Sequence, residues 1–299
     1  FIAIPDNDFR ARADHRHIGY FSRLVDDLTD PSDKPFKDII VRWHLVKKDP
    51  TAAISEPVTP ITFWVENTTP VEYRQTIIDA GLQWNKAFEQ AGFKNAVQMK
   101  IMPDDATWDP NDLRYNVIRW VSSSAPPYAA IGPNFVNPKN GQILGADITF
   151  ELSAINSSFY TRSLFEKMTG AEAAEASFYL PGITHLQEHQ CDIAALASEQ
   201  TNFAKAVFGT MDAGEKNNFT TQQKQLLTWM VMHEMGHTLG LTHNMKASQL
   251  HSLNDLHNKS LTQREGLMGS VMDYPDVNIA ATPAQQGDFY TQTVGPYDK

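Results

Sequence analysis

The sequence has one cysteine, few basic residues and no long apolar run, and each shortage excludes a class of protein. The single Cys191 allows neither an intrachain disulfide framework nor a cysteine-based zinc knuckle. With 25 Lys and Arg against 35 Asp and Glu, the net charge is −10, which disfavours nucleic acid as a partner because phosphate neutralisation needs clustered cations. No apolar run approaches the roughly 20 residues that cross a bilayer, so no membrane span is expected.

The sequence shows no internal repeats and no low-complexity stretches. It begins at Phe1, and no charged segment followed by an apolar run comes next, so we expect any targeting segment to lie outside the chain. The 299 residues allow one large domain or two smaller ones, with a substantial core in either case.

Short apolar runs between turn signals predict an α/β fold. Residues 1–36 are polar and irregular, which predicts an extended lead-in. A long helix is expected to begin at Thr69, with Glu72 completing a capping box, and to end at Gly92. The expected strands span residues 38–46, 61–65, 96–101, 115–121 and 143–151. Strands interleaved with a long helix favour a mixed sheet over a helical bundle.

The stretch HEMGHTLGLTH (233–243) puts two histidines and a glutamate into the most hydrophobic helix candidate, residues 224–240. His233 and His237 are four residues apart, so they share one helix face, about 6 Å apart along the axis, and can converge on one point. Glu234 lies roughly 100° round the helix, beside that point. A buried carboxylate without a cation is unfavourable, whereas a divalent metal ion bound by the imidazoles removes this penalty. This is the physical basis of the H-E-x-x-H motif.

A catalytic zinc site usually has three protein ligands, and His243 can supply the third. A continuous helix would leave His243 about 9 Å beyond His237, so the chain must bend. Gly240 can adopt the left-handed conformation that turns the chain at a helix end. The sequence therefore predicts a Zn²⁺ site formed by His233, His237 and His243. The alternative is a structural polar cluster without a metal.

The same stretch matches H-E-x-x-H-x-x-G-x-x-H at all its fixed positions and resembles the signature of the metzincin zinc metallopeptidases. A second mark of that family is a methionine turn beneath the metal, and GSVMDYP (269–275) offers one with Met272. Tyr274 matches the position of a metal-facing tyrosine in astacin- and serralysin-like members. The resemblance implies that Glu234 is the general base and that Tyr274 helps to stabilise the oxyanion. The alternatives are a plain core role for Met272 and a packed tyrosine with a hydrated hydroxyl for Tyr274.

Stretches over residues 37–299 are similar to the large zinc-dependent metzincin-like peptidases of bacteria. They are PVTPITFWVENTTP, GLQWNKAFEQAGFKNA, LRYNVIRWV, GQILGADITFE and LTHNMKAS. The resemblance implies an α+β zincin fold, with a twisted mixed sheet, a backing helix, an active-site helix and a small irregular C-terminal subdomain. It also implies a secreted, periplasmic or cell-surface location. A peptide or protein substrate is expected to bind in extended form along an edge strand near Gly145–Ile148.

The expected domain organisation has three parts. The lead-in covers residues 1–36, the N-terminal subdomain covers 37–243 with an insertion at about 152–222, and the C-terminal subdomain covers 244–299. Metzincins follow the methionine turn with a further helix, and no helix pattern follows Asp288. We therefore expect the C-terminal subdomain to be truncated.

Three other stretches contain residues that could form a site. HLQEH (185–189) spells the inverted zincin motif, but it follows a chain breaker and lacks a suitably spaced third ligand, so a polar rim is favoured. Cys191 is predicted to be an ordinary thiol and not an inhibitory zinc ligand. DHRH (14–17) is predicted to be solvated, with an N-terminal segment near the active site as the alternative.

Zinc-dependent hydrolysis of peptide bonds is the function that the sequence favours. One alternative is a zinc hydrolase of small peptides or non-peptide amides. The other is an inactive zinc-containing binding module, against which the intact Glu234 argues because an inactive relative could lose this residue and keep the metal.

Overall fold

The computed structural model describes residues 3–15, 17–26, 28–29, 31, 36–123, 130–151 and 216–299. The HLQEH stretch, Cys191 and most of the expected insertion lie outside these residues. The strands are β1 (Ser22–Asp26), β2 (Phe36–Ile40), β3 (Ile61–Val65), β4 (Val97–Ile101), β5 (Asn116–Val121), β6 (Ala130–Ile131), β7 (Asn134–Val136), β8 (Ile143–Ala146) and β9 (Ile148–Glu151). The α-helices are α1 (Val71–Leu82), α2 (Asn85–Gln90), α5 (Lys216–Leu239) and α6 (Lys259–Glu265). Within the described ranges, no helix is long and apolar enough to cross a membrane.

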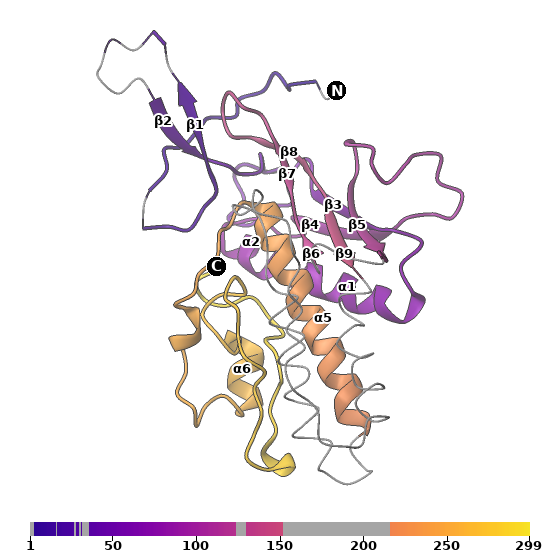
Figure 1. Ribbon diagram of the computed structural model, residues 1–299. Coiled ribbons are helices and arrows are strands. Elements are labelled where there is room, and N and C mark those ends of the chain that lie inside the picture. The colour runs from indigo at the N-terminus through magenta and orange to yellow at the C-terminus, as the bar shows by residue number, and fades with distance from the viewer. Residues whose placement is uncertain are drawn as a thin grey trace, which may run out of the picture.

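A five-stranded sheet in the order β4-β3-β5-β9-β6 forms the centre of the fold (Figure 1). The first four of these strands run parallel, and β6 runs antiparallel to β9 at the edge. On β3, Ile61, Phe63 and Val65 are buried, while the residues between them are only partly covered. The buried side chains share one hydrophobic core with those of α1 and α5, which pack against each other. The predicted mixed α/β architecture is confirmed.

The helix predicted from Thr69 to Gly92 is interrupted, and its predicted capping box is wrong. Pro70 is the N-cap of α1 without a side-chain cap, and the helix ends at Leu82 before α2 begins at Asn85. At the break, the Trp84 indole donates to the Met232 carbonyl at 3.0 Å. The Asn85 side chain hydrogen-bonds both the N–H and the C=O of Val97. These bonds to α5 and β4 hold the break, and the local sequence pattern contains no sign of them.

The predicted strand 143–151 is two strands, and its second part, β9, is not the edge strand that the prediction made it. The chain bends at Asp147, whose carboxylate accepts a hydrogen bond from the Val117 N–H at 3.1 Å. As a result, β8 pairs with β7 in a separate two-stranded sheet, while β9 enters the main sheet. The earlier strand β6 (Ala130–Ile131) pairs antiparallel with β9 on its outer side. In the main sheet the edge strand on this side is therefore β6, while β8 lies at the edge of the two-stranded sheet.

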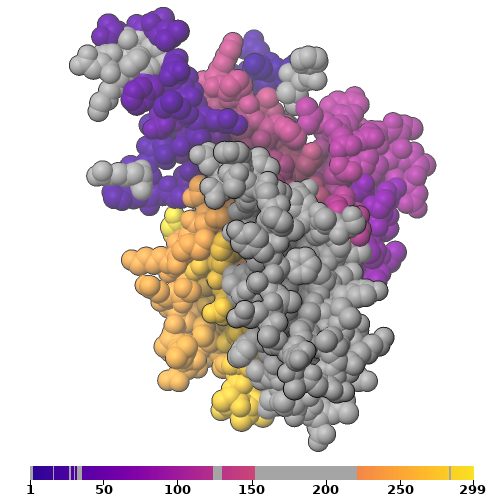
Figure 2. Space-filling view, viewed as in Figure 1, coloured from indigo at the N-terminus to yellow at the C-terminus, as the bar shows by residue number. Residues whose placement is uncertain are grey.

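The lead-in contains a strand, contrary to the prediction that residues 1–36 are irregular. β1 pairs antiparallel with β2, and this hairpin stands out from the rest of the molecule in Figures 1 and 2. β2 covers only the beginning of the strand predicted at 38–46. His15 and His17 of the DHRH stretch are exposed.

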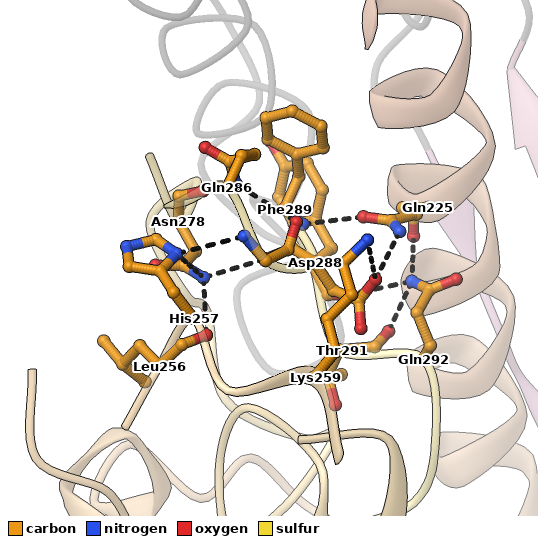
Figure 3. Close-up of polar contacts among 12 residues, drawn as sticks. Gln225, Leu256, His257, Lys259, Asn278, Gln286, Asp288, Phe289, Thr291 and Gln292 are labelled. Atoms are coloured by element: carbon orange, nitrogen blue, oxygen red, sulfur yellow. Dashed lines mark hydrogen bonds and ion pairs between the residues drawn. The ribbon is translucent and has the colours of Figure 1, made fainter. Parts of the chain in front are cut away.

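The C-terminal residues attach to α5 through the side chain of Gln225 (Figure 3). The side-chain amide of Gln225 donates to the Asp288 carboxylate at 2.8 Å and accepts from the Phe289 N–H at 2.6 Å. The backbone carbonyl of Gln225 accepts a hydrogen bond from the Gln292 side chain at 3.1 Å. Phe289 and Tyr290 are buried in the core, the latter stacked on Trp229. These contacts place the C-terminal region beside the helix that carries the histidines.

Candidate metal centre

The helix predicted at residues 224–240 is confirmed as the C-terminal part of α5. Its apolar side chains are buried on most sides, as the sequence pattern indicates. They are Leu226, Leu227, Trp229, Met230, Val231, Met232 and Met235. A helix covered in this way removes its polar side chains from water, so they need partners inside the protein.

The three histidines of the motif lie together. Their ligand atoms are all within 4.8 Å of one another, and no other group of this kind occurs in the described part of the chain. His233 is fully buried, and His237 is nearly so. The Nε2 atoms of His237 and His243 are 3.1 Å apart. The structure thus brings together the residues that the sequence predicted as ligands.

The bend at Gly240 brings His243 back toward the helix. Gly240 has a φ of 105°, its N–H donates to the His237 carbonyl at 3.0 Å, and the Leu241 N–H donates to the Gly236 carbonyl at 3.0 Å. This pair of bonds is the Schellman arrangement that ends many helices. A Cβ at Gly240 would lie 2.5 Å from the Val41 carbonyl oxygen, so both conformation and space require glycine here. The predicted glycine bend is confirmed.

Two backbone carbonyls set the orientation of the imidazoles. The Val271 carbonyl lies 2.8 Å from His233 Nδ1, and the Leu241 carbonyl lies 2.9 Å from His237 Nδ1. Because a carbonyl oxygen only accepts hydrogen bonds, each Nδ1 must carry the hydrogen and each Nε2 keeps its lone pair. Burial, and then the neighbouring imidazoles, lower the pKa of His233 well below its usual value. This ring is therefore neutral, as a metal ligand must be.

The donor set suits a zinc ion. Zinc–nitrogen bonds of about 2.0–2.1 Å imply ligand nitrogens about 3.3 Å apart, close to the 3.1 Å between His237 and His243. Three neutral imidazoles are a common ligand set of catalytic zinc, which leaves a fourth position open. The residues that could hold the ion are His233, His237 and His243.

Glu234 is fully buried next to the first histidine. The edge of the sheet approaches it closely, because a Cβ at Gly132 would lie 2.6 Å from the Glu234 carbonyl oxygen and 3.3 Å from its Oε2. Gly132 directly follows β6. The carboxylate therefore lies close to the chain that leaves the outermost strand, a relation that the sequence motif does not reveal.

Tyr274 reaches the cluster, and Met272 packs against the helix that carries two of its histidines. Met272 is fully buried, and its thioether lies so close to Gly236 of α5 that a side chain there would require Met272 to shift. The Tyr274 hydroxyl is 2.7 Å from His243 Nε2, and its ring stacks on His233 with centroids 5.3 Å apart. The GSVMDYP stretch thus covers one side of the histidines.

Asp298 is a supporting residue that sequence reasoning missed. Its carboxylate accepts hydrogen bonds from the Ser270 hydroxyl, the Val271 N–H at 2.9 Å and the Gly295 N–H at 2.8 Å. It therefore holds the peptide whose carbonyl orients His233. Burial raises the pKa of Asp298 even though these bonds favour the carboxylate. No spacing rule links this residue to the histidine motif.

We expect Asp298→Ala to lower the free energy of unfolding by at least about 2 kcal/mol, because each buried donor left without a partner costs about 1–3 kcal/mol. Urea unfolding measures this loss. Asp298→Asn is the matched control, since its one carbonyl oxygen can still accept from both backbone N–H groups. A change within about 0.5 kcal/mol for the alanine variant, which is typical of neutral surface positions, would contradict this role.

Comparison with known families supports the identity of this centre. Residues 215–299 match a family model described as Met-zincin. No curated protein and no solved structure matches the chain. The matched segment includes α5, all three histidines and the GSVMDYP stretch. Residues 215–299 are therefore similar to the Met-zincin family, and the histidine cluster lies within this segment.

Proposed function

We propose that the protein is a zinc-dependent endopeptidase. The observation that supports this most directly is the convergence of three imidazoles beside the buried Glu234, inside the segment that matches the Met-zincin family. Two of the rings donate from Nδ1 to backbone carbonyls, so their Nε2 atoms carry no hydrogen. A secreted, periplasmic or cell-surface location is part of the proposal and follows from the family resemblance.

In the proposed mechanism His233, His237 and His243 hold the zinc ion, and Glu234 handles the protons. When bound, zinc lowers the pKa of a water molecule toward about 7 and polarises the scissile carbonyl. The Glu234 carboxylate takes a proton from this water and then delivers it to the leaving amine. Its burial keeps bulk water away from the proton that it carries.

Tyr274 is proposed to act on the developing oxyanion. Its hydroxyl lies 2.7 Å from His243 Nε2, which puts it within reach of the proposed site. With zinc held by the histidines, the hydroxyl would donate a hydrogen bond to the carbonyl oxygen of the substrate as negative charge develops there.

The substrate is proposed to lie in extended form beside β6 (Ala130–Ile131). Among the described residues, β6 is the outermost strand of the sheet and has no strand on its outer side. Such an edge offers N–H and C=O groups to an extended peptide. The close approach of Gly132 to Glu234 would place that peptide next to the proposed base.

We expect Glu234→Gln to bind zinc like the wild type and to hydrolyse peptides about 10²–10⁴-fold more slowly, because the amide cannot take a proton from water. Metal analysis and cleavage of casein, short peptides and acylated amino sugars measure both properties. Glu66→Gln, which changes a buried carboxylate at the end of β3, is the matched control and should keep its activity. Wild-type turnover by Glu234→Gln would show that the proposed base is wrong, and hydrolysis of amino sugars alone would favour the amidase alternative.

Removal of zinc should destabilise the folded protein. At a zinc concentration of 100 times the dissociation constant, the ion adds about 2.7 kcal/mol to the free energy of unfolding. Thermal unfolding before and after treatment with a chelator, and after zinc is returned, measures this effect. His237→Ala should abolish the zinc-dependent shift, whereas the exposed His15→Ala should retain it. Equal shifts in both variants would place the ion elsewhere.

Tyr274→Phe should lower kcat by about 10²-fold, the lower end for loss of one oxyanion donor, because zinc remains as the main electrophile. KM and zinc affinity should stay close to those of the wild type, since the three proposed ligands, His233, His237 and His243, are unchanged. Steady-state kinetics and zinc titration test this prediction. Tyr73→Phe, which alters a tyrosine stacked on Trp120, is the control. An unchanged kcat would leave Tyr274 with a packing role only.

A further inference from the structure

A short segment of the lead-in, Gly19–Phe21, lies against the turn that follows α5. Tyr20 forms an antiparallel bridge with Leu241. The Phe21 N–H donates to the Gly240 carbonyl at 2.7 Å, and the Thr242 N–H donates to the Gly19 carbonyl at 3.0 Å. The segment and the turn therefore form a small two-stranded ladder, although they are far apart in the sequence.

This ladder includes the hydrogen-bond acceptor of one histidine. The carbonyl of Leu241, the residue bridged to Tyr20, accepts the hydrogen bond of His237 Nδ1 at 2.9 Å. The ring of Phe21 also packs on the His237 imidazole, with centroids 5.6 Å apart and a tilt of 48°. His243 follows two residues after Leu241, so the ladder also directs the chain toward the third histidine. Two of the three proposed ligands thus depend on this turn.

The segment and the turn are packed without spare room. A Cβ at Gly19 would lie 2.8 Å from Thr242 Oγ1, which is closer than Cβ atoms normally approach. The Phe21 carbonyl accepts a hydrogen bond from the Val41 N–H at 2.8 Å. The Val41 carbonyl also packs against Gly240 and leaves no space for a side chain there. The lead-in is therefore fixed between the turn and the chain that follows β2.

We propose that Gly19–Phe21 is a positioning segment of the metal centre. It holds the Leu241 carbonyl in place, and this carbonyl in turn orients the His237 ring for zinc binding. The same ladder directs the chain that leads to His243. The inference rests on the proposed function, since zinc is the ion concerned. Loss of an outer-shell partner that orients a ligating histidine typically weakens metal binding by about 10–100-fold. The segment touches no reacting atom, so its effect should appear in metal affinity before it appears in the chemistry.

The test introduces a clash and then removes it. Gly19→Ala directs a methyl group at Thr242 Oγ1 and should weaken zinc binding by at least about 10-fold. Thr242→Ala alone should have little effect, and the double variant should recover most of the lost affinity because the closest atom is gone. The zinc dissociation constant is measured by competition with a chromophoric chelator. The visible spectrum of the cobalt-substituted protein reports ligand geometry without any assay of activity.

Two further variants separate positioning from general stability. Gly287→Ala would place its Cβ 2.8 Å from the His257 Cα, so it produces similar crowding within the C-terminal region. It should lower the melting temperature and leave zinc affinity unchanged. If Gly19→Ala does not yield folded protein, Phe21→Ala carries the test, because it removes the ring beside His237 and leaves the backbone ladder intact. It should weaken zinc binding and alter the cobalt spectrum.

The possible outcomes are distinct. Zinc affinity equal to the wild type in folded Gly19→Ala, or in Phe21→Ala if that variant has to be used, overturns the inference alone. A double variant as weak as Gly19→Ala also overturns it, because the clash would not be the cause. A wild-type protein that binds no zinc overturns the proposed function and, with it, this inference. Weak binding in Gly19→Ala and recovery in the double variant support it.

Discussion

The hydrogen bonds from two imidazole Nδ1 atoms to backbone carbonyls are the constraint on which the metal centre depends. They fix the tautomers of His233 and His237, so that both Nε2 lone pairs face the same point. The helix supplies the rings, but their acceptors come from outside it. The Val271 carbonyl belongs to the GSVMDYP stretch, and the Leu241 carbonyl belongs to the turn after α5. A change in either stretch would therefore rotate a ring without altering any histidine.

Both acceptors are in turn supported by residues near the two ends of the chain. Asp298 accepts from the Val271 N–H, and Tyr20 bridges to Leu241. The two supports also touch, since the Gly19 N–H donates to the Tyr297 hydroxyl at 3.1 Å. Metal affinity in such a centre is part of the folding free energy, because ligands and supports are brought together only in the folded chain. The proposed centre is thus a property of the whole domain.

The elements that the sequence predicted correctly are those governed by local patterns. The strands at residues 61–65, 96–101 and 115–121 match the predicted bounds to within a residue or two, and the helix at 224–240 is the C-terminal part of the longer α5. The break between α1 and α2 and the bend at Asp147 were missed, because each is held by hydrogen bonds to distant strands or helices. The prediction of one continuous edge strand at residues 143–151 failed for the same reason, because the bend at Asp147 depends on a hydrogen bond to the distant Val117. The domain boundaries and the exported location stay predictions.

The sequence by itself determined which side chains could share one metal ion. Residues four apart on a helix face the same way, and a glycine that alone tolerates a positive φ can end that helix and return His243. Both are properties of a few consecutive residues. Only the tertiary structure decided which carbonyls orient the rings, that β6 and not β9 forms the edge beside Glu234, and that the lead-in packs on the turn at Gly240. Those contacts join residues far apart in the chain, and packing and hydrogen bonding across the whole fold select them.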